Sequence, residues 1–137
     1  MYPEMLVAPM REELTSAGFS QLMSADDVVS ALNKKKGTQL LVVNSVCGCA
    51  AGAARPGILK SLQNNKKPSE LITVFAGMEA EAVSKAREFL LPYPPSSPAI
   101  ALFKDGELVH MIERHNIEGR TAQMIADNLQ LAYEEFC

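Results

Sequence analysis

Apolar residues recur along the chain with two different periods, and these periods predict which segments are helices and which are strands. Short, nearly continuous apolar runs such as residues 40–43 are typical of strands covered on both faces of an α/β sheet. The pattern predicts helices over residues 3–18, 24–36, 48–65, 79–91 and 118–136. It predicts strands over residues 39–44, 71–75, 99–103 and 108–112. Each helix should pack one apolar face on the resulting sheet.

The order of the predicted elements is α-α-β-α-β-α-β-β-α. Strands separated by a helix should be parallel, and the last two strands, joined through Asp105 and Gly106, should form an antiparallel hairpin. We therefore expect an α/β fold with a mixed four-stranded sheet and helices on both faces. The predicted inward positions are Met5, Leu6, Met10 and Leu14 in the first helix and Met124, Ile125, Leu129 and Tyr133 in the last. Pro9 and Pro56 should bend or divide their helices.

Composition narrows the class of protein. The 137 residues fit one domain, with residues 1–37 as an N-terminal helical segment packed on it. A net charge of −3 and a pI near 5.4 argue against nucleic acid or an anionic membrane as an obligate partner. No apolar run approaches the roughly 20 residues of a membrane span, and no signal peptide is visible. Three cysteines are too few for a secreted disulfide scaffold, so we expect a cytoplasmic location.

Two of the three cysteines, Cys47 and Cys49, lie where a predicted strand meets a predicted helix, separated only by Gly48. The positive end of the helix dipole and its unpaired N–H groups favour a thiolate at this place, and the thiolate is the nucleophile. We expect Cys47 to attack, because it lies on the N-terminal side, and Cys49 to resolve the mixed disulfide. Gly48 leaves room for so small a ring to close, and a strained bridge of this kind is readily reduced.

A metal site is the main chemical alternative. Zinc or an iron–sulfur cluster needs about four ligands. Only His110, His115 and Cys137 remain, and they form no close second pair. A redox pair is therefore favoured over a metal site and over two merely structural thiols. A histidine could also activate Cys47 as a base. Cys137 is most simply an exposed terminal thiol, with intermolecular pairing as the second interpretation.

Four features of the chain together resemble the thioredoxin fold. They are the strand-to-helix junction with its cysteines, Ser97-Pro98 before a strand, the turn at residues 104–107 and the last helix. The resemblance implies a cis-proline at Pro98 facing the cysteines, with Ser97 and Pro98 binding substrate beside Gly48. The chain departs from thioredoxin because it has no tryptophan and no Cys-X-X-Cys. Leu41 stands where thioredoxin keeps a buried acid, so local stabilisation of the thiolate must contribute more to activation.

A closer resemblance is to the bacilliredoxins, small bacterial proteins also described as Cys-X-Cys disulfide isomerases. It is carried by residues 7–15, 42–52, 54–56, 74–77, 95–98 and 114–119. It implies that Cys47 takes bacillithiol from S-bacillithiolated cytoplasmic proteins and that Cys49 then releases it. Implied partners are such proteins or other disulfide-containing proteins, the small thiol itself, and a reductase whose identity is open; no bound cofactor is implied. Isomerisation or weak reduction of protein disulfides is the alternative, and a metal-binding or non-catalytic thioredoxin-like module ranks behind both.

Overall fold

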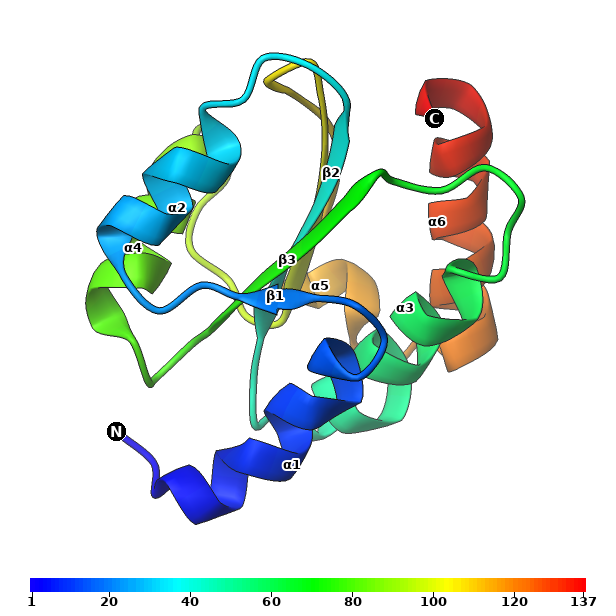
Figure 1. Cartoon of the computed structure of the whole chain (residues 1–137). Helices are drawn as coiled ribbons and strands as arrows, with labels where there is room; N and C mark the ends of the chain where they lie inside the picture. The colour runs from blue at the N-terminus through cyan, green and yellow to red at the C-terminus, as the bar shows by residue number, and fades with distance from the viewer.

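The computed structural model describes residues 1–137 and is built around a five-stranded sheet with strand order β1-β3-β2-β4-β5 (Figure 1). The strands are β1 (Ser20–Gln21), β2 (Thr38–Asn44), β3 (Glu70–Phe75), β4 (Ala99–Lys104) and β5 (Glu107–Ile112). The α-helices are α1 (Glu4–Thr15), α2 (Ala25–Leu32), α3 (Arg55–Ser61), α4 (Ala80–Phe89), α5 (Arg114–Ile117) and α6 (Ala122–Phe136), and a π-helical turn, η1 (Ala50–Ala54), precedes α3. No helix is both long enough and apolar enough to cross a bilayer.

The sheet is mixed, as predicted. Strand β3 is parallel to β2 and β1, whereas β4 is antiparallel to both β2 and β5. The expectation that strands separated by a helix are parallel is confirmed for β2 and β3 but is wrong for β3 and β4, which run in opposite directions with α4 between them, because β4 joins the sheet on the other side of β2. The prediction of four strands is wrong by one, because β1 adds a fifth at the edge beside β3, where Ser20 pairs with Ile72. A strand of two residues is too short to show an alternating pattern, so it can be recognised only from its partner.

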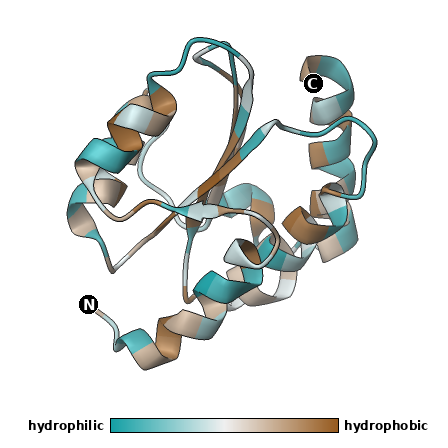
Figure 2. Ribbon diagram, viewed as in Figure 1, coloured by the Kyte–Doolittle hydropathy of each residue, from teal (hydrophilic) through white to brown (hydrophobic).

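Strand β2 lies at the centre and sends alternate side chains into two apolar cores. Leu40 and Val42 join a cluster that includes residues of η1, α3 and α6, whereas Leu41 and Val43 join one that includes residues of α2 and α4. Figure 1 shows α2 and α4 on one side of the sheet and α3 and α6 on the other. Figure 2 shows hydrophobic positions along the central strands and hydrophilic positions on the loops. The continuous apolar run therefore reflects burial on both faces.

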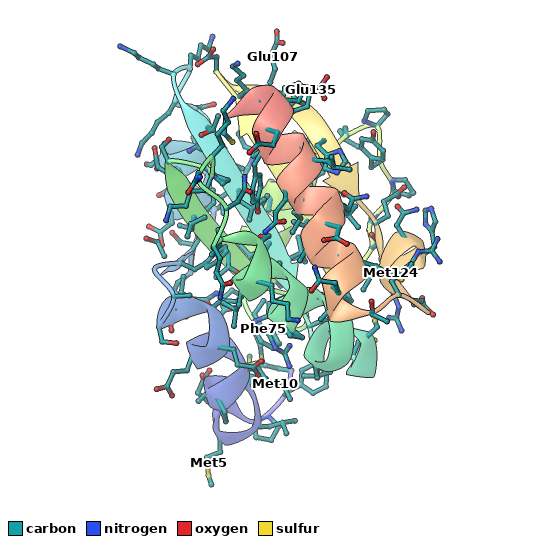
Figure 3. All side chains as sticks on the ribbon, turned by 90° about the vertical axis from the view of Figure 1, so that its right-hand side faces the viewer. Met5, Met10, Phe75, Glu107, Met124 and Glu135 are labelled. Atoms are coloured by element: carbon teal, nitrogen blue, oxygen red, sulfur yellow. The ribbon has the colours of Figure 1, made fainter.

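The inward faces of the terminal helices differ from the prediction. In α1 the buried positions are Val7, Arg11 and Leu14, whereas Met5 is 90% exposed and projects away from the rest of the molecule in Figure 3. Met124 is 49% exposed on α6, although the other inward positions predicted for that helix are buried. The apolar face of α1 was misassigned because its central buried residue is a charged one.

Arg11 is buried because partners surround its guanidinium group. Its Nε lies 3.1 Å from a carboxylate oxygen of Glu4, its Nη2 bonds to Glu79, and its Cζ lies 5.2 Å from the centroid of the Phe75 ring. These contacts satisfy a charge that would be costly to bury alone. They also fix α1 to the start of α4 and the end of β3.

Several predicted boundaries change for identifiable reasons. Helix α1 continues through Pro9 without dividing. Ser24 caps α2 as predicted, by accepting the Asp27 N–H at 3.1 Å, but α2 ends at Leu32. The helix predicted over residues 118–136 begins only at Ala122, as α6, because Gly119 has a φ of 76° that is unsuited to a helix; the short α5 before it was not predicted. The predicted hairpin turn is present, with positive φ at both Asp105 and Gly106.

The segment after the cysteines is helical from residue 48 to residue 61, rather than to 65. It is π-helical over η1, immediately before Pro56. The N–H of Arg55 bonds to the carbonyl of Ala50, five residues back, and Pro56 has no N–H to continue the ladder. The wider turn therefore accommodates the proline within one helical segment.

Helices α3 and α6 approach closely at Gly57. A β-carbon there would lie 2.6 Å from Ile125 Cβ and 2.8 Å from the backbone oxygen of Ala122, whereas one at Gly52 in η1 would meet nothing within 4 Å. Neither neighbour of Gly57 is the mobile end of a side chain. The absence of a side chain at this position therefore sets the distance between the two helices.

We expect Gly57→Ala to lower the free energy of unfolding by about 1–3 kcal/mol, because overpacking outweighs the better helix propensity of alanine. Gly52→Ala is the matched control and should leave stability unchanged or raise it by up to about 1 kcal/mol. Urea unfolding followed by circular dichroism measures both. Equal stability of the two variants would contradict the close-packing argument.

Candidate active site

The two cysteines lie just beyond the carboxyl end of β2, and the structure brings their sulfur atoms together. Cys47 Sγ is 2.7 Å from Cys49 Sγ, and both residues are half-buried and not bonded to each other. Gly48 between them is exposed, and a β-carbon there would meet no atom within 4 Å. The short spacing therefore brings the two thiols into contact beyond the end of β2.

A buried arginine holds the loop that carries Cys47. Arg55 is 2% exposed, and its Nη1 donates to Asn44 Oδ1 at 2.9 Å and to the Ser45 carbonyl at 2.8 Å. Its Nε lies 3.1 Å from a carboxylate oxygen of Glu13, which is partly exposed. A guanidinium group suits this position because its donors diverge in one plane. Arg55 thus joins α1, the end of β2 and α3.

Hydrogen bonds continue from Asn44 to the backbone of Cys47. Asn44 Nδ2 donates to the Met10 carbonyl at 3.1 Å, and Asn44 Oδ1 also accepts the Ser45 N–H at 2.8 Å. Ser45 Oγ in turn accepts the N–H of Cys47 at 3.1 Å. These bonds satisfy polar groups that would otherwise be buried without partners. They fix the direction in which Cys47 leaves the sheet.

The two thiols differ in acidity. The thiol of Cys49 donates a hydrogen bond that lowers the pKa of Cys47, and the N–H groups of Cys49 and Ala50 and the positive charge of Arg114 lower it further. Burial raises the pKa of Cys49, and so do its hydrogen bond to Cys47 and the charge that develops there. Cys47 therefore ionises first, which favours it as the attacking thiol. Cys49 packs against the apolar core and remains protonated longer.

Cys47 opens onto a depression of about 490 Å³. Its lining is Tyr2, Ser45, Val46, Cys47, Gly48, Ala76, Gly77, Ser97 and Arg114. The bond between Ser97 and Pro98 is cis, as the resemblance to thioredoxin predicted. Pro98 itself is buried and does not line the depression, so Ser97 presents this segment to the site.

The other candidates from the sequence lie in different surroundings. His110 Nε2 is 2.7 Å from Asn128 Oδ1, and His115 Nε2 is 3.8 Å from a carboxylate oxygen of Glu113; neither ring bonds to Cys47. Cys137 is exposed at the C-terminus, just after α6. Figure 1 shows this terminus at the opposite end of the sheet from η1. No group of three or more histidine, cysteine, aspartate or glutamate side chains could hold a metal ion.

Comparison with known proteins assigns the family. A family model described as disulphide isomerase matches residues 2–137. The chain is 63% identical over 135 residues to the bacilliredoxin of Cytophaga hutchinsonii, covering 98% of this chain and 99% of that protein. It is 51% identical over 136 residues to a bacilliredoxin of Halalkalibacterium halodurans, covering 99% and 94%. The chain belongs to the bacilliredoxin family.

Solved structures agree on the fold of this bacilliredoxin family member. Mitochondrial thioredoxin 3 from Saccharomyces cerevisiae superposes with a TM-score of 0.59 at 17% identity, covering 90% of this chain and 98% of that one. Thioredoxin O2 from Arabidopsis thaliana gives 0.56 at 20% identity, covering 86% and 96%. The fold is thioredoxin-like, and with the family and the paired thiols it supports a thiol oxidoreductase.

Arg55, Arg114 and Tyr2 belong to the site but were not found from the sequence. Arg55 carried a signal, because it is the only charged residue in the alanine-rich segment that follows the cysteines. Arg114 lies in the stretch 114–119 that carries the resemblance to bacilliredoxins, but nothing there assigned it to the site, and Tyr2 carried no signal. Both are far from Cys47 in the sequence, and only the fold brings them there. Leu41 is fully buried among apolar residues, and the site takes its electrostatic support from other groups.

The acidity of Cys47 can be measured by its alkylation with iodoacetamide as a function of pH, followed by mass spectrometry of the peptide that carries it. A lowered pKa means that thiolate persists to lower pH, so we expect Cys47 to react at lower pH than Cys49. Cys49→Ala removes the largest cause and should move the Cys47 profile to higher pH. Cys49→Ser keeps an O–H donor and should move it less. An unchanged midpoint in Cys49→Ala would contradict the assigned cause.

Arg55→Met should destabilise the fold by about 1–3 kcal/mol, because buried acceptors on Asn44 and Ser45 lose their donor. It should also slow alkylation of Cys47 at pH 7 by loosening the loop. Arg120→Met removes an exposed arginine and should change stability by less than about 0.5 kcal/mol. Urea unfolding and the alkylation rate test both effects; an Arg55→Met protein that behaves like the control would refute this positioning role.

Proposed function

We propose that this protein removes bacillithiol from S-bacillithiolated proteins through Cys47 and Cys49. The observation that carries the proposal is the contact between an accessible thiol of lowered pKa and a second, less acidic thiol 2.7 Å away. Its membership of the bacilliredoxin family supports the same choice of adduct. The depression beside Cys47 is open to the surface, which favours an adduct that protrudes from a folded protein.

The reaction proceeds by two exchanges. The Cys47 thiolate attacks the bacillithiol sulfur of the mixed disulfide, so that a bond forms between them and the substrate protein leaves as a thiolate, which is then protonated. Cys49 loses its proton and attacks Cys47 Sγ. Bacillithiol leaves as a thiol, and the Cys47–Cys49 disulfide forms. The two electrons that reduced the substrate thus come from the cysteine pair.

The pair must then be reduced again. Two electrons and two protons from a dithiol or thiol reductant would restore it, supplied in the cell by a reductase of undetermined identity. We place this cycle in the cytoplasm, where such reductants keep thiols reduced. Bacillithiol is a co-substrate or product here, and no bound cofactor takes part. Ser97 would pair with the backbone of the substrate protein next to its modified cysteine.

Isomerisation or reduction of protein disulfides is the second candidate, and the description of the matching family model as disulphide isomerase favours it. The same Cys47 would attack a sulfur of the protein disulfide, and Cys49 would release the protein again. The two functions differ in whether the second sulfur belongs to a small thiol or to a protein. The same site would serve both functions, so only an assay with the two kinds of substrate can distinguish them.

The direct test is to incubate the reduced protein with one carrier protein modified by bacillithiol or by glutathione, and to follow release of the small thiol. We expect faster release of bacillithiol. Cys47→Ser should reduce release to background, and Cys49→Ser should stop after one exchange with the adduct on Cys47, visible by mass spectrometry. Cys137→Ser is the control and should react normally.

Retained turnover in Cys47→Ser, or an adduct found on Cys137, would refute the assigned roles. A parallel assay with a protein whose disulfides are scrambled decides between the two candidates. Faster recovery of that protein than release of either small thiol would favour the isomerase.

A further inference from the structure

Arg114 is the one charged side chain other than the cysteine that lines the depression beside Cys47. No carboxylate lines it, and the remaining polar side chains are the hydroxyls of Tyr2, Ser45 and Ser97. The guanidinium group therefore stands beside the attacking sulfur, in a depression whose other lining side chains are uncharged; Glu118, with which Arg114 forms an ion pair, lies outside that lining. Such a surrounding favours a ligand that is small, polar and negatively charged.

The guanidinium group of Arg114 is held in place while part of it stays free. Its Nε donates to Glu118 Oε1 at 3.0 Å, and its Nη1 donates to the Ser97 carbonyl at 3.3 Å. Its Nη2 makes no hydrogen bond, although the group has five N–H donors in all. The side chain is 45% exposed. Arg114 is thus pre-positioned by two contacts and retains donors for a third.

Tyr2, which also lines the depression, is held by a contact of its own. The ring of Tyr2 lies over Gly77, where an added β-carbon would come within 2.7 Å of Tyr2 Cε2. Gly77 has a φ of +88°, so the absence of a side chain serves both the backbone and the ring. Tyr2 is 40% exposed and faces the depression that Arg114 lines. The pocket therefore has a cation and an aromatic wall, both held by contacts within the protein.

We propose that Arg114 binds a carboxylate of the small thiol in the mixed disulfide, so that the enzyme selects adducts of carboxylate-bearing thiols over neutral ones. This inference rests on the proposed function and names its substrate class. In the first exchange the carboxylate contact places the sulfur of the small thiol, rather than that of the protein, against Cys47. A planar guanidinium with free N–H groups is suited to a carboxylate. The coulombic effect of Arg114 on both cysteines agrees with its nearness to the reacting sulfurs.

The test uses one carrier protein whose single cysteine bears either 3-mercaptopropionate, which has a carboxylate, or 2-mercaptoethanol, which has a hydroxyl. Single-turnover release rates are divided by the rate of dithiothreitol on the same adduct, which removes differences in intrinsic reactivity. We expect the protein to prefer the carboxylate adduct by about two- to fivefold, which lies within the range of exposed ion pairs. The preference should fall as salt is added.

Arg114→Gln should abolish this preference, and Arg114→Lys should retain part of it. The matched control Arg120→Gln, also an exposed arginine, should leave it unchanged. If Arg114 only activates Cys47 or braces the Ser97 loop, its replacement will slow both adducts equally and leave their ratio intact. That result, or a wild-type ratio near one, overturns the inference.

The two proposals fail in different ways. Release of both adducts at equal relative rates leaves adduct removal standing and refutes only the selection by Arg114. Failure to release bacillithiol as well as both of these adducts, together with reduction of a protein disulfide, refutes adduct removal itself and with it the role of Arg114 toward a small thiol.

Discussion

The arrangement of the site depends on the burial of Arg55. A guanidinium group with only 2% exposure must have polar partners, and these are the side chain of Asn44, the carbonyl of Ser45 and the carboxylate of Glu13. They come from the end of β2, the cysteine loop and α1. One buried charge therefore fixes three segments that lie far apart in the sequence. Helix α1 contributes no reacting group to the site, but its Glu13 helps to hold Arg55 in place.

The sheet makes that burial possible. Strand β2 is paired on both sides, so its carboxyl end is held while the chain turns out of the sheet towards η1. From Leu40 to Val43 the side chains of β2 are apolar and fill both faces, and the next residue, Asn44, is polar and bonds to Arg55. The π-helical turn before Pro56 then carries the segment back over the sheet. The cysteines therefore lie between the last core residues of β2 and the helical segment that follows.

Much of this could be predicted from the sequence. Apolar runs identified the four long strands and the strand-to-helix junction of Cys47 and Cys49, because these depend on local pattern. The rule for strands joined through a helix gave the right direction for β2 and β3 but the wrong one for β3 and β4, whose relative direction is set by where β4 joins the sheet. The two-residue β1 and the separate α5 were not predicted, since neither is long enough to show a periodic pattern of apolar residues. The positions of Arg114 and Tyr2 beside Cys47 were not predicted for another reason. Tertiary contacts with Ser97 and Gly77 place them there. Such contacts leave no trace in local spacing.

The asymmetry between the two thiols follows from the same geometry. Burial raises the pKa of Cys49, and the hydrogen bond that Cys49 donates to Cys47 raises it further while it lowers the pKa of Cys47. Thioredoxin-like activation through a buried acid is not open to this chain, because Leu41 occupies the place where the resemblance puts it. Cys49 therefore has two parts in the proposed cycle. It supports the thiolate of Cys47 before attack and supplies the second thiolate afterwards, once the new disulfide has removed the charge that held its proton.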